Sequence, residues 1–234
     1  MIDLHTHVLP HLDDGARSRA ESLAMLRESA AQGVTLCAAT PHCNVHRNED
    51  IASFCERRDQ RCEELLQKAK SEAYTIPKIL LGAEVYLDNE ISVYPDIEKL
   101  CIGDTKYMLV ELTPGKYDCK IVDWLYDLKI KGIQPIVAHI DRYDYWKELL
   151  QDMQGLGAVY QINASRFLEF RGRWFLREFL KYEDRVVIGS DMHGSMHRKP
   201  CMKDAYGKAR KLFGDLADGM FNGAALKTTL LSEA

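Results

Sequence analysis

The sequence predicts an α/β barrel in which each parallel strand is followed by a helix. Short apolar segments alternate with longer helical patterns along the 234 residues, which is typical of βα units rather than hairpins. In addition, histidines and carboxylates follow all but one of these segments. Active sites of barrels are assembled at the C-terminal ends of the strands, so both observations favour the same architecture.

Seven strands are expected, at residues 2–6, 34–40, 79–85, 107–112, 133–138, 158–162 and 185–190. Helices are expected between them, at residues 18–32, 51–73, 120–131, 143–156, 167–182 and 203–213, with a last helix at 215–231. The first helix has the clearest limits, because Ser18 and Glu21 match a capping box and Gly33 ends the pattern. We see no repeat or linker, so residues 1–234 are expected to form one domain.

Composition excludes several classes of partner. The formal net charge is −4 and both signs are interspersed, which argues against nucleic acid as a ligand. No apolar stretch approaches the roughly 20 residues of a membrane span, and the first residues lack a signal peptide pattern, so a cytoplasmic protein is expected. The seven cysteines form no Cys-x-x-Cys pair and are expected to be reduced thiols.

Possible metal ligands stand at the strand ends. They are His5, His7, His42, Glu84, Glu111, His139, Asp191 and His193. His5 and His7 lie two residues apart in a strand, which places both rings on one face, and Asp191 and His193 repeat this spacing. Any one pair is a weak signal, but burying the whole set would be costly without a cation.

Other polar residues near these strand ends have simpler interpretations. The sixth strand ends at Gln161 and Asn163, which are polar but weak ligands. The Asp13-Asp14-Gly15 segment has the composition of a turn, although beside the histidines it becomes a further candidate. His11, His46 and His197 are expected to lie in loops.

Motifs in order along nearly the whole chain resemble the polymerase and histidinol phosphatase (PHP) superfamily. They are Ile2-Asp3-Leu4-His5-Thr6-His7, Asp13-Asp14-Gly15, Thr40-Pro41-His42, Gly82-Ala83-Glu84, Val110-Glu111, His139-Ile140-Asp141-Arg142 and Ser190-Asp191-Met192-His193. The likeness is to the branch of bacterial protein-tyrosine phosphatases linked to capsular and exopolysaccharide synthesis. This chain departs from the branch at Cys43, where a second histidine is frequent, and at Ile140-Asp141, where Pro-Glu is common.

The resemblance implies a distorted, TIM-like (β/α)7 barrel with three metal ions. It implies one ion held by His5, His7, Glu84 and Asp191, a second by Glu84, Glu111 and His139, and a third by Asp14, His42 and His193. Glu84 would then bridge two ions. Arg142 and Arg198 match arginines that surround the phosphate in this family.

These parallels imply a manganese-dependent phosphatase in which metal-activated hydroxide attacks phosphotyrosine. The mixed histidine and carboxylate ligands suit manganese, with iron or zinc as alternatives. A phenolate leaving group, with a conjugate pKa of about 10, reduces the need for a general acid, and none is identified. The implied substrate is the tail of a bacterial tyrosine autokinase. The sequence indicates no oligomeric state.

Three alternatives remain open. A histidinol-phosphate phosphatase, or another small-molecule phosphoesterase of the superfamily, would use the same ligands. A regulatory metal-binding module would keep the ligands but lack turnover. Cys55 and Arg61 have the Cys-x5-Arg spacing of cysteine-dependent phosphatases, but the intervening residues contain no glycine and fit a helix, whereas that chemistry needs a phosphate-binding loop.

Overall fold

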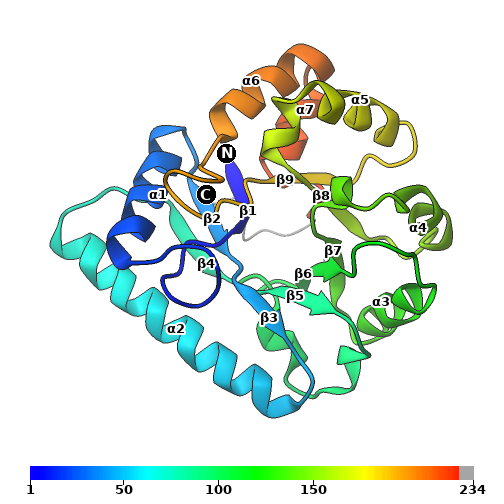
Figure 1. The fold of residues 1–234 in the computed structure, drawn as a ribbon, viewed down its shortest axis with the longest axis horizontal. Coiled ribbons are helices and arrows are strands. Elements are labelled where there is room, and N and C mark those ends of the chain that lie inside the picture. Colours follow the sequence, from blue (N-terminus) through cyan, green and yellow to red (C-terminus); the bar gives the residue numbers. More distant parts are fainter. Residues whose placement is uncertain (227–234) are drawn as a thin grey trace.

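The computed structural model describes residues 1–226, with parallel strands at the centre and helices around them (Figure 1). The strands are β1 (Ile2–Thr6), β2 (Leu36–Ala39), β3 (His42–Asn44), β4 (Lys78–Leu81), β5 (Glu84–Leu87), β6 (Tyr107–Leu112), β7 (Gln134–Val137), β8 (Val159–Asn163) and β9 (Val186–Gly189). The α-helices are α1 (Arg19–Ala31), α2 (Asn48–Ser71), α3 (Lys120–Ile130), α4 (Trp146–Asp152), α5 (Phe170–Phe179), α6 (Met202–Phe213) and α7 (Leu216–Phe221). Short 3-10 helices lie at Ile91–Val93, Ile97–Leu100, Ile140–Arg142 and Ala164–Phe167.

The strands pair in parallel, in the orders β1-β2-β4 and β3-β5-β6-β7-β8-β9. β2 continues into β3 after residues 40–41, and β4 continues into β5 after residues 82–83, so two chain segments take part in both sheets. Pro41 lies in the first break and has no N–H for a sheet ladder. Gly82 lies in the second, where a Cβ atom would come within 3.3 Å of Thr40 Cγ2. These two breaks distort the strand arrangement.

The first and last strands also meet. Thr6 and Met192 form a parallel bridge, and the backbone N–H of Asp191 donates to the carbonyl of His5 at 2.8 Å. The buried Asp3 carboxylate accepts the N–H of Ser190 at 2.8 Å. The strands therefore follow one another around a common centre in chain order, from β1 to β9 (Figure 1).

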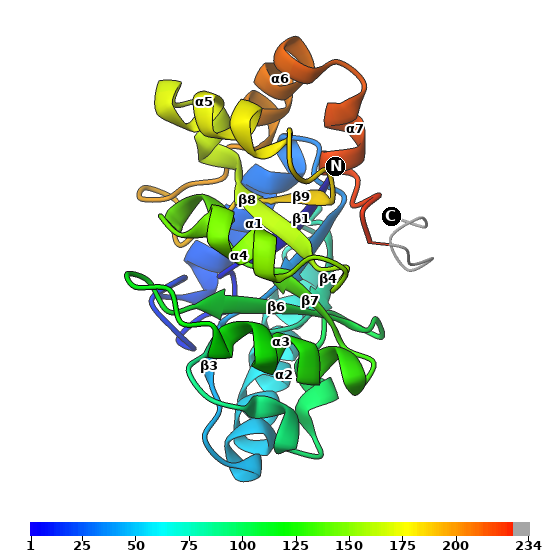
Figure 2. The same ribbon diagram turned by 90° about the vertical axis from the view of Figure 1, so that its right-hand side faces the viewer.

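Two apolar clusters hold this arrangement together. The larger one contains residues of both strands and helices, from Val8 to Phe221, and Figure 2 shows the helices on the outside of the strands. The smaller one is enclosed by the strands and includes Leu4, Leu36, Leu109, Ile136, Val159 and Val187. Buried residues of six of the nine strands thus fill the centre, as in the packed interior of a barrel.

The N-terminus of α1 shows how local chemistry sets an element boundary. Ser18 Oγ accepts the backbone N–H of Glu21 at 3.1 Å, as a helix cap does. The Glu21 carboxylate accepts from the N–H of Arg17 rather than from Ser18, so the predicted capping box is only half formed. The helix ends before Gly33, whose φ of +86° favours glycine.

The predicted α/β class, with parallel strands and surrounding helices, is confirmed. The expected strand at 79–85 is wrong as one element, because the chain kinks at Gly82, and β3 was not expected. The expected helix at 143–156 begins only at Trp146, after the 3-10 turn at 140–142, and that at 167–182 begins at Phe170. The last predicted helix ends at Phe221, before a turn that contains Gly223, whose φ is +73°. Its final part, residues 227–231, lies outside the described residues.

Within residues 1–226, no helix combines the length and the apolar character that crossing a bilayer requires.

Candidate metal centre

The predicted ligands converge at the ends and kinks of the strands. His5 lies in β1, and His7 follows it directly. His42 begins β3 and is the register partner of Glu84, which begins β5. The remaining members come from the end of β6, the segments after β7 and β9, and the loop after β1: Glu111, His139, Asp191, His193 and Asp14. The fold thus brings all nine predicted ligands into one cluster.

His5, His7 and Glu84 form the most deeply buried part of this cluster. The Nε2 atoms of His5 and His7 lie 3.0 Å apart, and Glu84 Oε2 lies 3.1 Å and 3.2 Å from them. Asp191 Oδ1 is 3.6 Å from His5 Nε2. All four side chains are buried, so two ring nitrogens and two carboxylates face one small space.

Glu84 connects this group to a second one. Its Oε1 atom lies 2.8 Å from Nε2 of His139, and its Oε2 atom lies 3.0 Å from Nδ1 of His42. Glu111 lies 3.4 Å from His139 Nε2 and 3.9 Å from His42 Nδ1. The central position of Glu84 is the geometry that a bridging carboxylate needs.

A third group lies toward solvent. Asp14 Oδ1 is 3.3 Å from Nε2 of His42 and 3.2 Å from Nε2 of His193. The Asp14 side chain is 69% exposed, so this side of the cluster is open. His7 also lies beside this group, with its ring centroid 3.8 Å from that of His193.

The three groups differ in part from the sets that the family resemblance implies. Potential ligand atoms come together as His7, Asp14, His42 and His193, as His5, His7 and Glu84, and as His42, Glu84 and Glu111. His42 therefore replaces His139 beside Glu84 and Glu111, although His139 contacts both carboxylates. The cluster contains the expected residues, but His7, His42 and Glu84 each belong to two groups, so the groups overlap.

Hydrogen bonds turn the histidine rings inward. Nδ1 of His7 lies 2.6 Å from Asp13 Oδ2, and Nδ1 of His193 lies 3.0 Å from the carbonyl of Asp191. Nδ1 of His5 lies 3.1 Å from Gln161 Oε1. Because each Nδ1 faces an acceptor, it carries the proton in the neutral ring, and Nε2 offers its lone pair to the cluster.

Gln161 is orientated by its own neighbours. Its Oε1 atom accepts the backbone N–H of His139 at 2.6 Å, and its Nε2 donates to Asn163 Oδ1 at 2.9 Å. A backbone N–H can only donate, so the oxygen of Gln161 must face His139 and His5. Asn163 in turn donates to Asp191 Oδ2 at 2.9 Å. One polar chain at the end of β8 therefore orientates ligand residues from three other segments.

Sequence reasoning missed these orientating roles, although it noticed the residues. Asp13 belongs to the Asp13-Asp14-Gly15 motif, and Gln161 and Asn163 are the polar end of the sixth strand. The signal was the spacing of Gln161 and Asn163, which matches that of His5 and His7. Glutamine and asparagine are weak metal ligands, so a search for ligands passes over Gln161 and Asn163, which orientate the ligand side chains instead.

The electrostatics favour positive charge in the buried part of the cluster but a neutral ring at His193. Burial alone would lower the pKa of His5, but the carboxylates of Glu84 and Asp191 outweigh it and raise that pKa to about 9. Burial would raise the pKa of Glu84, but His5 and other imidazoles hold it well below its usual range. Burial, followed by His7, lowers the pKa of His193 to about 4, which leaves its ring neutral.

The residues fit divalent cations. Within residues 1–226, Glu84 Oε2 and His193 Nε2 are buried polar atoms that form no hydrogen bond of suitable geometry. Buried polar atoms without partners are costly, and a cation would satisfy both. The mixture of imidazoles and carboxylates suits transition-metal ions. His139 and Asp191 also have positive φ angles, 30° and 52°, a strain that concentrates at functional sites.

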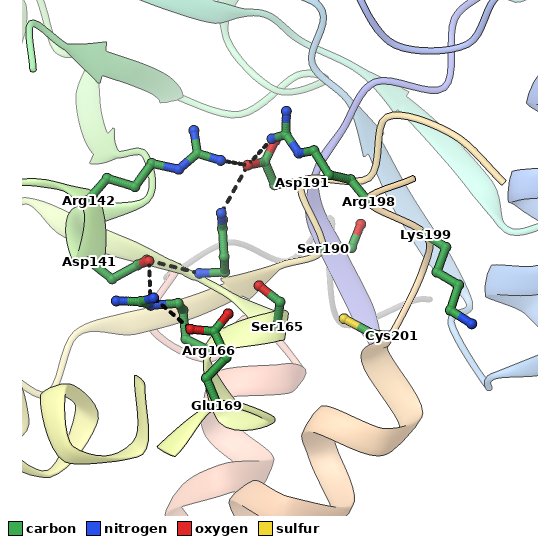
Figure 3. A pocket seen from close by; sticks show the side chains of 11 residues that line it. Asp141, Arg142, Ser165, Arg166, Glu169, Ser190, Asp191, Arg198, Lys199 and Cys201 are labelled. Atoms are coloured by element: carbon green, nitrogen blue, oxygen red, sulfur yellow. Dashed lines mark hydrogen bonds and ion pairs between the residues drawn. The ribbon is translucent and has the colours of Figure 1, made fainter. Parts of the chain in front are cut away.

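Arg142 and Arg198 stand at the edge of the cluster and meet at one carboxylate. Arg142 Nη2 lies 2.5 Å from Asp191 Oδ2, and the Arg198 guanidinium contacts the same oxygen. Figure 3 shows both side chains reaching Asp191 from different sides. They line a cavity of about 440 Å³ together with Asn163, Arg166 and Lys199. This arginine pocket offers several positive charges beside the ligands.

The other sequence candidates lie outside the cluster. His11, His46 and His197 are exposed loop residues. Cys55 and Arg61 both lie within α2, and Arg61 pairs with Glu64 at 3.3 Å. Burial raises the pKa of the Cys55 thiol, which disfavours the reactive thiolate. The rival cysteine mechanism therefore has no phosphate-binding loop at this position.

Residues 1–225 match the family described as capsular polysaccharide synthesis, CpsB/CapC. The chain is 30% identical to the tyrosine-protein phosphatase CpsB of Streptococcus pneumoniae, which covers 92% of this chain and 91% of that one. It is 32% identical to the tyrosine-protein phosphatase YwqE of Bacillus subtilis, with 92% and 85% covered.

Solved structures agree with this similarity. Structures of YwqE from Bacillus subtilis and CpsB from Streptococcus pneumoniae, described as unique metal-dependent tyrosine phosphatases, match with a TM-score of 0.81 and 28% identity, over 97% of this chain and 94% of that one. A histidinol phosphate phosphatase from Lactococcus lactis matches with a TM-score of 0.55 and 14% identity, over 92% of this chain and 93% of that one. That second likeness concerns the fold alone.

Proposed function

The chain belongs to the CpsB/CapC family of capsular polysaccharide synthesis, and on this basis we propose that it is a metal-dependent protein-tyrosine phosphatase. The observation that carries the proposal is the convergence of five histidines and four carboxylates beside two arginines. Glu84 lies at the centre of this cluster, and Asp191 joins it to the arginine pocket. The relatives named above are tyrosine-protein phosphatases.

The proposed ligands divide into three sites. His5, His7, Glu84 and Asp191 hold one divalent ion, Glu84, Glu111 and His139 a second, and Asp14, His42 and His193 a third. We propose manganese for all three, because the donors include several carboxylate oxygens. Bound ions supply an acidified water molecule and neutralise charge on the phosphoryl group. The whole chain is proposed to form one domain around this centre, since the larger apolar cluster extends from Val8 to Phe221.

Arg142 and Arg198 are proposed to bind the phosphoryl oxygens. Both side chains are 42% exposed, and their guanidinium groups contact Asp191 at the edge of the cluster. Asp191 holds them there with one oxygen while its other oxygen faces His5 and His7. Charge-assisted hydrogen bonds from planar guanidinium groups suit a phosphate. The arginines therefore position the ester relative to the buried ligands.

A phenolic ester is the favoured substrate. The leaving phenolate has a conjugate acid pKa of about 10, so its departure depends less on a general acid than that of an alkoxide. We propose a phosphotyrosine protein as the substrate, and specifically the tail of a bacterial tyrosine autokinase. The CpsB/CapC family and the tyrosine phosphatases within it support a phosphotyrosine protein as the substrate, and the autokinase tail is the more specific part of the proposal.

The test compares kcat/KM for three substrates with the manganese-loaded protein. They are a phosphotyrosine peptide, the same peptide with phosphoserine, and histidinol phosphate. We expect the phosphotyrosine peptide to be hydrolysed fastest. A clear preference for histidinol phosphate would instead assign the small-molecule activity, and absence of turnover with all three would favour a regulatory module. Metal analysis of the native protein checks the number and identity of the ions.

A further inference from the structure

A second cavity, rich in aromatic side chains, adjoins the arginine pocket. We propose that this aromatic groove binds an aromatic or large apolar side chain of the polypeptide segment that carries the phosphotyrosine. The inference rests on the proposed function and deepens it, because it describes what the enzyme recognises beyond the phosphorylated residue. The groove has a volume of about 570 Å³ and is lined by Tyr143, Trp146, Phe170, Trp174 and Phe175, with Asp141, Asp144, Arg166 and Arg171.

The floor of the groove is packed, whereas its walls are exposed. Phe175 is buried, and its ring packs edge-on against Trp146 at 5.5 Å. By contrast, the side chains of Phe170 and Trp174, both on α5, are 81% and 67% exposed. Large aromatic groups are common at binding surfaces, where they supply contact area at little cost in conformational entropy. Exposed walls above a packed floor are therefore suited to receive another side chain.

The groove is next to the proposed phosphate site. Asp141 and Arg166 line both the aromatic groove and the arginine pocket. The two residues pair with each other at 3.0 Å, and the Asp141 side chain is buried. Figure 3 shows this pair on the same side of the pocket as Arg142. A peptide with its phosphoryl group at the arginines thus has the groove immediately beside it.

The floor is also connected to the metal centre. The Tyr143 hydroxyl lies 3.3 Å from Nδ1 of His139 and accepts the backbone N–H of Leu112 at 2.9 Å. The residue at the bottom of the groove therefore contacts a proposed metal ligand. This continuity favours a substrate segment as the occupant.

Other occupants fit less well. Acidic and basic lining residues balance, with Asp144 and the buried Asp141 against Arg166 and Arg171, so the groove lacks the basic cluster that binds the anionic headgroups of a bacterial membrane. A second copy of the chain seated over Phe170 and Trp174 would stand beside the pocket that the substrate must enter. A flanking side chain of the substrate fills the groove while the phosphoryl group of the same segment enters the arginine pocket.

The test uses Trp174→Ala, with Tyr126→Ala as the control. Tyr126 is an aromatic residue on α3 with 55% exposure and does not line the groove. The substrates are p-nitrophenyl phosphate and two phosphotyrosine peptides that differ only in their flanking residues, aromatic in one and glycine or serine in the other. We expect Trp174→Ala to lower kcat/KM for the aromatic-flanked peptide about tenfold, mainly through KM. Rates with p-nitrophenyl phosphate should stay within about twofold, a window well below that tenfold effect.

Several results would overturn the proposal. Equal losses with all three substrates would show that Trp174 supports the site rather than a flanking residue. If Trp174→Ala kept the wild-type preference for the aromatic-flanked peptide, the groove would not be the site that recognises the flanking residue. Loss of self-association in sedimentation, or loss of phosphatidylglycerol vesicle binding, without loss of the peptide preference would assign the groove to a second copy or to lipid.

The proposed function and the groove can fail separately. If the wild-type protein hydrolyses neither phosphotyrosine peptide, the proposed function fails. The binding of labelled, unphosphorylated versions of the two peptides, measured by fluorescence anisotropy, then tests whether the groove recognises an aromatic side chain. Tighter binding of the aromatic version, lost in Trp174→Ala but not in Tyr126→Ala, would support it, and equal binding would overturn it.

Discussion

Nδ1 of His7 lies 2.6 Å from Oδ2 of Asp13. The same carboxylate accepts the backbone N–H groups of Gly15 at 2.9 Å and of His42 at 3.0 Å. Burial opposes the charge of Asp13, but the hydrogen bond from His7 lowers its pKa to about 2. Asp13 is therefore a charged anchor between two ligand segments, and not itself one of the proposed ligands.

Replacing this anchor should weaken metal binding. We expect Asp13→Ala to reduce manganese affinity about 10- to 100-fold, the usual effect of removing a partner that orientates a metal-bound histidine. Isothermal titration calorimetry with the metal-free protein measures the change. Asp104→Ala, an exposed turn residue, serves as the control. Unchanged affinity in a folded Asp13→Ala protein would remove Asp13 from this role.

Gln161 offers a second test of the same principle. Gln161→Leu keeps the approximate volume but removes the oxygen that faces Nδ1 of His5 and the N–H of His139. We expect a loss of metal affinity of about 10-fold or more, with kcat partly restored at saturating metal. Calorimetry and kinetics over a range of manganese concentrations measure both effects. Equal kcat loss at all metal concentrations would contradict a role in orientating ligands.

Glu84 and Arg198 should differ in the kinetic constant that they affect. We expect Glu84→Gln to lower kcat more than Arg198→Ala does, because Glu84 contacts His5, His42 and His139 at the centre of the cluster. For Arg198→Ala the larger change should appear in KM, since the guanidinium is proposed to bind ground-state phosphate. Steady-state kinetics, with metal content measured on the same samples, checks the order. Normal rate and occupancy in Glu84→Gln would refute the central role.

Chelation should distinguish the metal and cysteine mechanisms. We expect a chelator to abolish activity with p-nitrophenyl phosphate and manganese to restore it, whereas Cys55→Ser should leave kcat within about twofold, far from the change of several orders of magnitude on losing a nucleophile. Cys55 lies within α2, and its thiol faces the carbonyl of Lys99 at 3.9 Å rather than a proposed ligand. Activity of the metal-free protein, or its loss in folded Cys55→Ser, would reverse this assignment.

The close packing of Gly189 against β1 makes a stability prediction. A Cβ atom at Gly189 would lie 2.5 Å from His5 Cβ, so Gly189→Ala should lower the free energy of unfolding by about 1–3 kcal/mol. Gly207 lies in α6 with open space around it. Gly207→Ala should therefore raise the stability by about 0.5–1 kcal/mol. Urea unfolding of the two metal-free variants measures both, and similar effects in the two would contradict the packing argument.

The strands were predictable because buried parallel strands are short apolar runs, and those at 2–6 and 107–112 have the predicted limits. The kinks at Pro41 and Gly82 were not, because they depend on pairing between distant strands. The helix expected at 143–156 starts late because His139 has a left-handed backbone and a 3-10 turn follows it. Propensity alone does not reveal such a tertiary constraint.

The candidate ligands were predictable from residue type and position after each strand. Their contacts were less so, because the side chains of Glu84 and His42 each face more than one group. The support of His5 by Gln161 joins β1 to β8, and no local pattern indicates which neighbour a ring will face. The aromatic groove likewise depends on α5 packing beside Tyr143 and Trp146, residues whose spacing carries no motif.

The meeting of β1 with the segment after β9 has a consequence for the synthesis of the protein. Asp3 and Ser190, whose hydrogen bond closes this junction, are 187 residues apart in the chain. His5 and His7 leave the ribosome long before Asp191 and His193. Pairings over such long separations form late in folding. A nascent chain that stops before Asp191 therefore lacks the complete centre, and the proposed metal sites form only once β1 has met the segment after β9.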